Sequence, residues 1–68
     1  MFNTTVNNRA KEIKPVLGDR VKDINAFIQS QVSAKHGRMK IVKALSEKYN
    51  LSMVDAAATW VAWQTYTL

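Results

Sequence analysis

The sequence predicts an all-α fold in which three to four short helices pack around the C-terminal one. Three observations lead to this prediction. Apolar residues recur at three- and four-residue steps through most of the chain, a spacing typical of helices with one buried face. Hydrophobic residues make up 47% of the composition, with only two glycines and one proline, so the chain is too apolar to be disordered. The stretch 52–68 is apolar on nearly every side and must be surrounded.

The chain is expected to form one domain spanning residues 1–68. Its 68 residues are close to the lower limit for folding without disulfides or metals. A first helix is expected from about Thr5, and Pro15 should end or kink it because the proline ring disfavours helical angles at Lys14. The apolar stripe of this helix is Val6, Ala10 and Ile13.

A second helix is expected over residues 20–35. Asp19 is a good N-cap residue, and Lys35 and His36 would lie in the last turn, where cations meet the negative end of the helix dipole. Gly37 follows at the position that favours a left-handed C-cap.

A third helix is expected over residues 38–49, ended by Asn50, because asparagine tolerates the left-handed conformation. The residues expected to point inward are Ile41, Val42, Leu45 and Tyr49, and those expected to point outward are Lys40, Lys43 and Glu47.

The last helix is expected to start with a side-chain cap, in which Ser52 accepts a hydrogen bond from the backbone N–H of Asp55 and the Asp55 carboxylate answers as in a short capping box. Only Asp55, Thr59 and Tyr66 form a polar edge on it. Because the other helices offer about one apolar stripe each, part of this helix is predicted to face a subunit or partner, with Trp63 in that interface and Trp60 nearer the core. The predicted interface residues are Trp60, Val61, Trp63 and Tyr66.

The charge distribution points to an anionic partner. The formal net charge is +5, and no acidic residue occurs between Asp23 and Glu47. We define residues 35–43, which lie inside that interval, as the basic segment. The start of a helix binds anions through its exposed N–H groups, and flanking cations strengthen such a site. The residues predicted to contact a nucleic acid or an acidic partner are Lys35, Arg38, Lys40 and Lys43.

The residue inventory argues against catalysis and against a bound metal or cofactor. His36 is the single histidine and there is no cysteine, so metal ligands are scarce. No second poised group accompanies a candidate acid or base, and no phosphate-cradling glycine motif occurs. We therefore expect no enzyme activity, no metal and no cofactor. The absence of cysteine and of a long apolar run predicts a cytoplasmic protein without a transmembrane span.

An alternative fold rests on a resemblance. From residue 28 onward, Ile28-Gln29-Ser30-Gln31-Val32-Ser33-Ala34 alternates as a strand does, Asn50-Leu51-Ser52 stands where a turn would be, and an apolar helix follows. This arrangement resembles the ribbon-helix-helix repressors. The resemblance implies a dimer with a strand near 28–34, base contacts from Gln29, Gln31 and Ser33, and a phosphate contact at Ser52.

Two functions follow as expectations. The first is a small DNA-binding protein that regulates transcription as a homodimer, with phosphate contacts from the basic segment and a subunit interface from residues 53–68. The alternative is an adaptor or inhibitor whose apolar last helix docks on another protein while the basic segment meets an acidic patch. Binding to an anionic membrane surface is a third reading, but the cations and the tryptophans belong to different helices.

Overall fold

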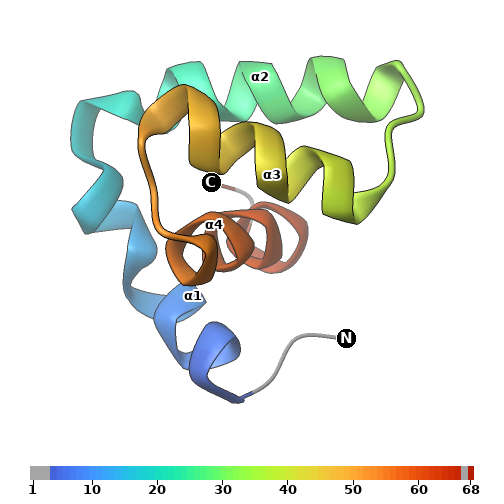
Figure 1. Ribbon diagram of the computed structural model, residues 1–68. Coiled ribbons are helices and arrows are strands. Elements are labelled where there is room, and N and C mark those ends of the chain that lie inside the picture. The colour runs from blue at the N-terminus through green and yellow to red at the C-terminus, as the bar shows by residue number, and fades with distance from the viewer. Residues whose placement is uncertain (1–3, 67) are drawn as a thin grey trace.

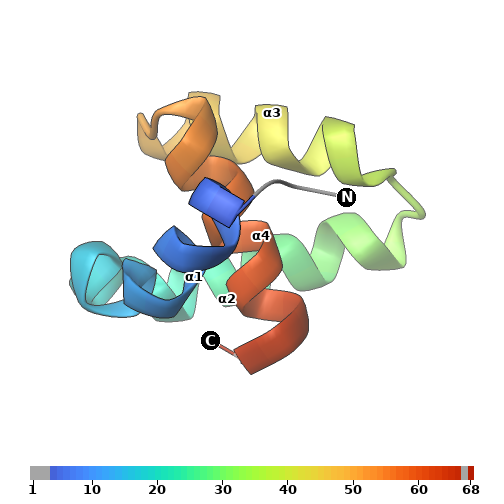
Figure 2. The same cartoon turned by 90° about the horizontal axis from the view of Figure 1, so that it is seen from below.

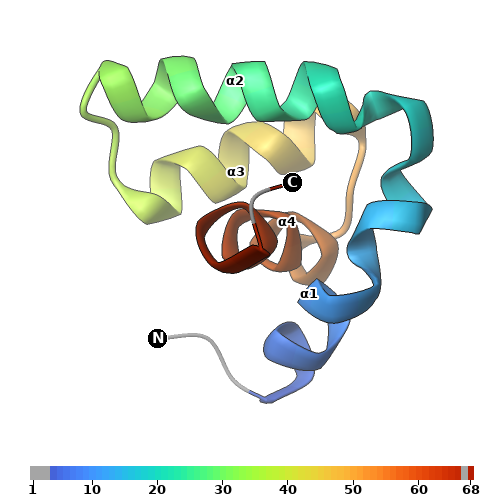
Figure 3. The same cartoon turned by 180° about the vertical axis from the view of Figure 1, so that it is seen from behind.

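A computed structural model describes residues 4–66 and 68 and contains four α-helices in that part of the chain. They are α1 (Thr4–Leu17), α2 (Val21–Ser33), α3 (Arg38–Tyr49) and α4 (Met53–Tyr66), with a short 3-10 turn η1 (Gly18–Arg20) between the first two. Helices α2 and α3 run side by side in opposite directions, and α4 crosses beneath them, seen nearly end-on in Figure 1. Helix α1 lies on the other side of α4, as the opposite view in Figure 3 shows. The all-α bundle around the C-terminal helix is thus confirmed.

Helix α1 packs closely along α4. Its buried residues, four and three apart, are Val6, Ala10, Ile13 and Leu17. Of the two outcomes expected at Pro15, an end or a kink of the helix, the end is wrong, because α1 continues to Leu17. Proline removes a single N–H, which at this position would bond the carbonyl of Lys11, and the loss falls in the last turn. Burial of Leu17 against the core holds the two residues that follow the proline in the helix.

The connection between α1 and α2 is tighter than expected. Gly18 adopts φ +59°, the left-handed conformation that glycine reaches without a steric penalty, and this ends α1. Asp19 then lies inside η1 and does not cap α2, which begins at Val21 with no side-chain hydrogen bond at its start. The prediction of an Asp19 N-cap is therefore wrong.

The alternative fold with a strand is also wrong. Residues 28–33 continue α2, and no strand occurs among the described residues. The apolar residues of α2 decide this outcome, because Ile24 and Ile28 are both fully buried and lie four apart, a helical spacing.

Helix α4 is the centre of the bundle. Its buried residues are Ala56, Ala57, Ala58, Thr59, Trp60 and Ala62. The small alanine side chains let the backbone of α1 approach closely. In Figure 2, seen from below, α1 lies in front of α4. Thr59, expected on a polar edge, is fully buried, and its hydroxyl donates to the Asp55 carbonyl at 2.8 Å, which satisfies it inside the helix.

Candidate anion-contact segment

The basic segment begins in the turn after α2. Lys35 has φ 63°, and its N–H donates to the Val32 carbonyl at 2.9 Å, while the His36 N–H donates to the Gln31 carbonyl at 3.1 Å. These two bonds and the left-handed residue form a Schellman motif that closes α2. The prediction of a left-handed Gly37 is therefore wrong, since Lys35 takes that role.

Gly37 instead starts α3. It has φ −75° and ψ 165°, an extended conformation, and its carbonyl accepts the first helical bond from the Ile41 N–H at 3.0 Å. A glycine has no side chain to cap the first-turn N–H groups, and no acidic residue lies in that turn. Arg38 and Lys40 occupy it, both exposed. The positive end of the helix dipole therefore meets cations where side-chain anions are preferred.

All four predicted contact residues are exposed: Lys35 lies in the turn between α2 and α3, and the other three, Arg38, Lys40 and Lys43, lie in the first half of α3. They do not form a single face. A helix turns by roughly 100° per residue, so Lys40 and Lys43 share the outward side of α3 while Arg38 points along a different direction from the first turn. Lys35 projects from the preceding turn. The predicted bounds of the third helix, 38–49, and the left-handed Asn50 at φ 54° are confirmed.

Met39 is a feature of this segment that the sequence analysis did not single out. Its side chain is 62% exposed and stands between Arg38 and Lys40. His36, one turn before it, is half-buried, and its Nδ1 lies within hydrogen-bonding distance of the Gln31 side-chain oxygen. The exposed basic segment therefore also carries an apolar side chain at its centre.

The four predicted interface residues of α4 do not share one surface. Trp60 is 8% exposed, so its expected place near the core is confirmed. The ring of Trp63 stacks on that of Trp60 with centroids 5.9 Å apart, and its Nε1–H donates to the Asn25 side-chain oxygen at 2.7 Å. Tyr66 is exposed on the same side, whereas Val61 lies nearly opposite Trp63. The role of these residues in an interface stays a prediction.

A polar cluster fixes α3 against the start of α2. The Tyr49 hydroxyl donates to the Asp23 carboxylate at 2.6 Å, and Arg20 donates to the Tyr49 carbonyl at 3.2 Å. The Tyr49 ring packs edge-on against Phe27, with centroids 5.9 Å apart. Burial, together with the bond to Asp23, raises the pKa of the Tyr49 hydroxyl. The cluster holds the end of α3 that is remote from the basic segment.

Among the residues that the structure describes, no group of three histidine, cysteine, aspartate or glutamate side chains is placed to hold a metal ion. Within the same residues, no helix is long and apolar enough to cross a membrane. Comparison of the chain with models of protein families, with curated proteins and with solved structures found no match. The functional argument therefore depends on the residues and their geometry.

Proposed function

We propose that this protein is a small, non-enzymatic nucleic-acid-binding regulator that contacts phosphates through its basic segment. The supporting observation is the exposure of Lys35, Arg38, Lys40 and Lys43 around an uncapped helix start, in an interval without acidic residues. Backbone N–H groups at a helix start and nearby cations both favour a phosphate. The proposal includes a cytoplasmic location.

The mode of binding is phosphate contact without direct base reading. The ammoniums of Lys40 and Lys43 on the outward side of α3 act as point charges. Ile41 and Val42, which lie between them in the sequence, are buried and offer no donor or acceptor to a base edge. Affinity then comes largely from release of counterions and is nearly independent of sequence. A regulator of this kind gains affinity when two copies bind together, since the second contact becomes intramolecular.

Self-association through α4 is the second part of the proposal. Of the residues of this helix predicted to lie in the interface, Val61 and Trp63 are half-buried and Tyr66 is exposed. Because Trp63 already bonds to Asn25 within the chain, Tyr66 and Val61 are the residues to substitute in a test of dimerisation. Tyr66→Glu and Val61→Glu should each leave the helical circular dichroism spectrum unchanged. The variant that lies in the interface should raise the dimer dissociation constant measured by sedimentation.

The test of phosphate contact is salt-dependent binding to generic duplex DNA. Replacing Arg38, Lys40 and Lys43 together by alanine should weaken binding equally across DNA sequences and lower the slope of log affinity against log salt by roughly three units. A matched variant with alanine at Lys11, Lys14 and Lys22 removes the same charge from exposed positions elsewhere. The proposal fails if the parent does not bind at low salt, or if both variants lose the same affinity.

The alternative function is an adaptor or inhibitor that docks on another protein through α4, with the basic segment on an acidic patch. The observation that favours it is the exposure of Met53 and Val54 in the first turn of α4. Apolar side chains beside a charged surface are typical of protein interfaces. A parent that binds no DNA at low salt but whose self-association or partner binding depends on Met53 and Val54 would favour this alternative.

A further inference from the structure

His36 lies inside the basic segment but is not one of its four proposed phosphate contacts. Its backbone is held in the turn that closes α2, because its N–H donates to the Gln31 carbonyl at 3.1 Å. Its ring is half-buried, and Nδ1 of the ring lies within hydrogen-bonding distance of the Gln31 side-chain oxygen. Two contacts with the same residue therefore hold the imidazole in place beside the cations.

The contact with Gln31 decides which nitrogen of the imidazole carries a hydrogen. An amide oxygen only accepts hydrogen bonds, so Nδ1 of His36 donates and holds the hydrogen. In the neutral ring Nε2 then carries a lone pair and no hydrogen. Among the described residues no buried side-chain nitrogen lacks a hydrogen-bond partner, so Nε2, which has no partner in that set, is open to solvent. This accessible nitrogen accepts in the neutral ring and donates only when the ring is protonated.

The charged residues beside His36 are all cations. Lys35 precedes it in the turn, and Arg38 and Lys40 follow it in the first turn of α3. No acidic residue occurs in the sequence between Asp23 and Glu47. A phosphate that binds these cations is therefore brought close to the imidazole as well.

The acidic residues of the chain belong to other parts of the helices. Asp19 and Asp23 lie at the start of α2, the opposite end of that helix from the turn. Glu47 lies in the last turn of α3, and Glu12 belongs to α1. Asp55, the only charged residue of α4, forms an ion pair with α1 at 2.8 Å. A bound phosphate therefore supplies an anion that the chain itself does not place beside the imidazole.

We propose that His36 is a fifth phosphate contact of the basic segment, and that it contacts phosphate only when its imidazole is protonated. The inference rests on the proposed nucleic-acid binding and adds a regulation to it. A phosphate oxygen is an acceptor, so it forms no hydrogen bond with the lone pair of Nε2 in the neutral ring, whereas Nε2–H of the charged ring donates to it. Because binding favours the charged ring, DNA affinity rises as the pH falls. Gln31 is the positioning residue, since it holds the hydrogen of the neutral ring on Nδ1.

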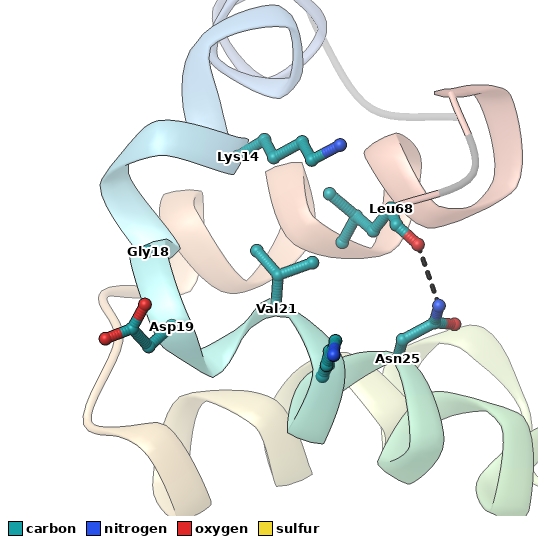
Figure 4. Close-up of a pocket in the computed structure, with 7 residues that line it drawn as sticks. Lys14, Gly18, Asp19, Val21, Asn25 and Leu68 are labelled. Carbon is teal, nitrogen blue, oxygen red and sulfur yellow. Dashed lines mark hydrogen bonds between the residues drawn. The ribbon is translucent and has the colours of Figure 1, made fainter.

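The lysines at the corner of α1 and α2 provide a control surface. A pocket of about 540 Å³ lies there, and its lining includes Lys14 and Lys22 (Figure 4). The same lining contains Asp19 and Leu68, whose carbonyl accepts from Asn25 at 2.7 Å. The single histidine of the chain is not part of it. Lys14→Gln with Lys22→Gln therefore removes positive charge without touching a group that titrates near neutral pH.

The test compares binding to generic duplex DNA at low salt at about pH 7.5 and about pH 5.5, a range in which histidine changes charge while lysine and arginine do not. The parent should bind about two- to fivefold more tightly at the lower pH, the effect of one exposed charge pair. Its salt slope should also be steeper there by about 0.9 unit. His36→Gln should bind with the same affinity at both pH values, whereas the Lys14 and Lys22 control pair should keep the pH ratio of the parent.

A second variant tests the role of Gln31. Gln31→Met removes the acceptor of Nδ1–H at similar side-chain length, so the neutral ring gains access to the form with hydrogen on Nε2. Its DNA binding should then be stronger at the higher pH, and its pH ratio smaller, than those of the parent. In the free parent, nitrogen-15 NMR of the imidazole at the higher pH should show the neutral hydrogen on Nδ1.

Three outcomes are decisive. The inference is overturned if the neutral ring of the free parent carries its hydrogen on Nε2, or if the parent and His36→Gln show the same pH ratio. Parent binding that is lost on triple alanine substitution of Arg38, Lys40 and Lys43 but does not change with pH overturns this inference alone and supports the proposed function. A parent that binds DNA at neither pH overturns both.

Discussion

The N-terminal turns of α3 and α4 differ in how their unpaired backbone N–H groups are capped and in the charges beside them. At α4, the Ser52 hydroxyl accepts a hydrogen bond from the Asp55 N–H at 3.1 Å, and the Asp55 carboxylate lies in the first turn, where it complements the helix dipole. The same carboxylate accepts from Arg9 Nε at 2.8 Å, which joins α4 to α1. The Asp55 carboxylate therefore forms an ion pair with Arg9 of α1 and does not complete the expected capping box. At α3, Gly37 provides no cap and the first turn holds cations.

The contrast separates a scaffold helix from a contact helix. Helix α4 has a side-chain cap in its first turn, and six of its fourteen residues are buried, so the middle of this helix serves the fold. Helix α3 keeps its first-turn cations exposed, and Gly37 at its N-cap position makes no side-chain cap. This arrangement lowers local stability but favours an external anion. Exposed Met39 and Met53, at 62% and 52%, show that exposure of an apolar side chain alone does not distinguish the two starts. The charges do.

The largest expected effect on stability comes from removing a buried side chain of α4. Trp60→Ala should destabilise the fold by about 3–5 kcal/mol, because it empties a buried site in α4. That amount matches the roughly 5 kcal/mol expected for a domain of this size, so the variant should be mostly unfolded. Lys43→Ala on the outward side of α3 should change stability by less than about 0.5 kcal/mol. Urea denaturation followed by circular dichroism measures both, and a folded Trp60→Ala chain would contradict the central role of α4.

The second effect concerns the cap of α4. Ser52→Ala should destabilise the fold by about 1 kcal/mol, because the Asp55 N–H loses its side-chain acceptor. Ser33→Ala, at the exposed last residue of α2, is a control that removes a hydroxyl without removing a cap. Equal denaturation midpoints for parent and Ser52→Ala would show that water replaces the cap and that the two helix starts are energetically alike.

The sequence predicts the helices well because each has an apolar stripe at helical spacing. It misplaces the end of α2 because the buried residues stop at Ile28, and nothing apolar in the core holds the helix beyond Ser33, since Val32 is exposed. The left-handed residue that closes α2 is therefore Lys35 and not the nearby Gly37. The pattern also cannot say which sides of α4 are covered, because a helix apolar all round carries no direction.

The candidate sites differ in the same way. The basic segment is contiguous in sequence, so its exposure could be predicted from the charges alone. The grouping of Lys14, Lys22 and Leu68 around one pocket could not, because these residues come together only when Leu68 packs against the corner of α1 and α2. Likewise, only the tertiary structure brings Asn25 to both Trp63 and Leu68.

The next effect tests whether Lys35 sacrifices stability for an outward charge. A side chain in the left-handed conformation carries a steric penalty that glycine avoids, so Lys35→Gly should stabilise the fold by about 0.5 kcal/mol, after the greater flexibility of glycine in the unfolded chain is subtracted. Lys43→Gln removes a charge without altering a left-handed position and should leave stability nearly unchanged. If Lys35→Gly lowers the denaturation midpoint, the charge of Lys35 stabilises α2, and the left-handed lysine does not lower the stability of the fold. In DNA binding, Lys35→Gly should reduce the salt slope by roughly one unit.

An effect on stability no larger than that of Lys35→Gly is expected when the start of α3 is converted into a start like that of α4. Gly37 has an extended conformation suited to an N-cap, and the space around a Cβ added there is open, so Gly37→Asp fits without displacement. The carboxylate should cap the first turn, complement the dipole and stabilise the fold by about 0.5 kcal/mol. The same carboxylate would occupy the place of a phosphate, so DNA affinity at low salt should fall. Gly37→Asn supplies a cap of similar shape without charge and should retain most of the affinity. Equal DNA affinity of the parent and Gly37→Asp would show that phosphate does not contact the start of α3, and the contrast between the two helix starts would then concern stability alone.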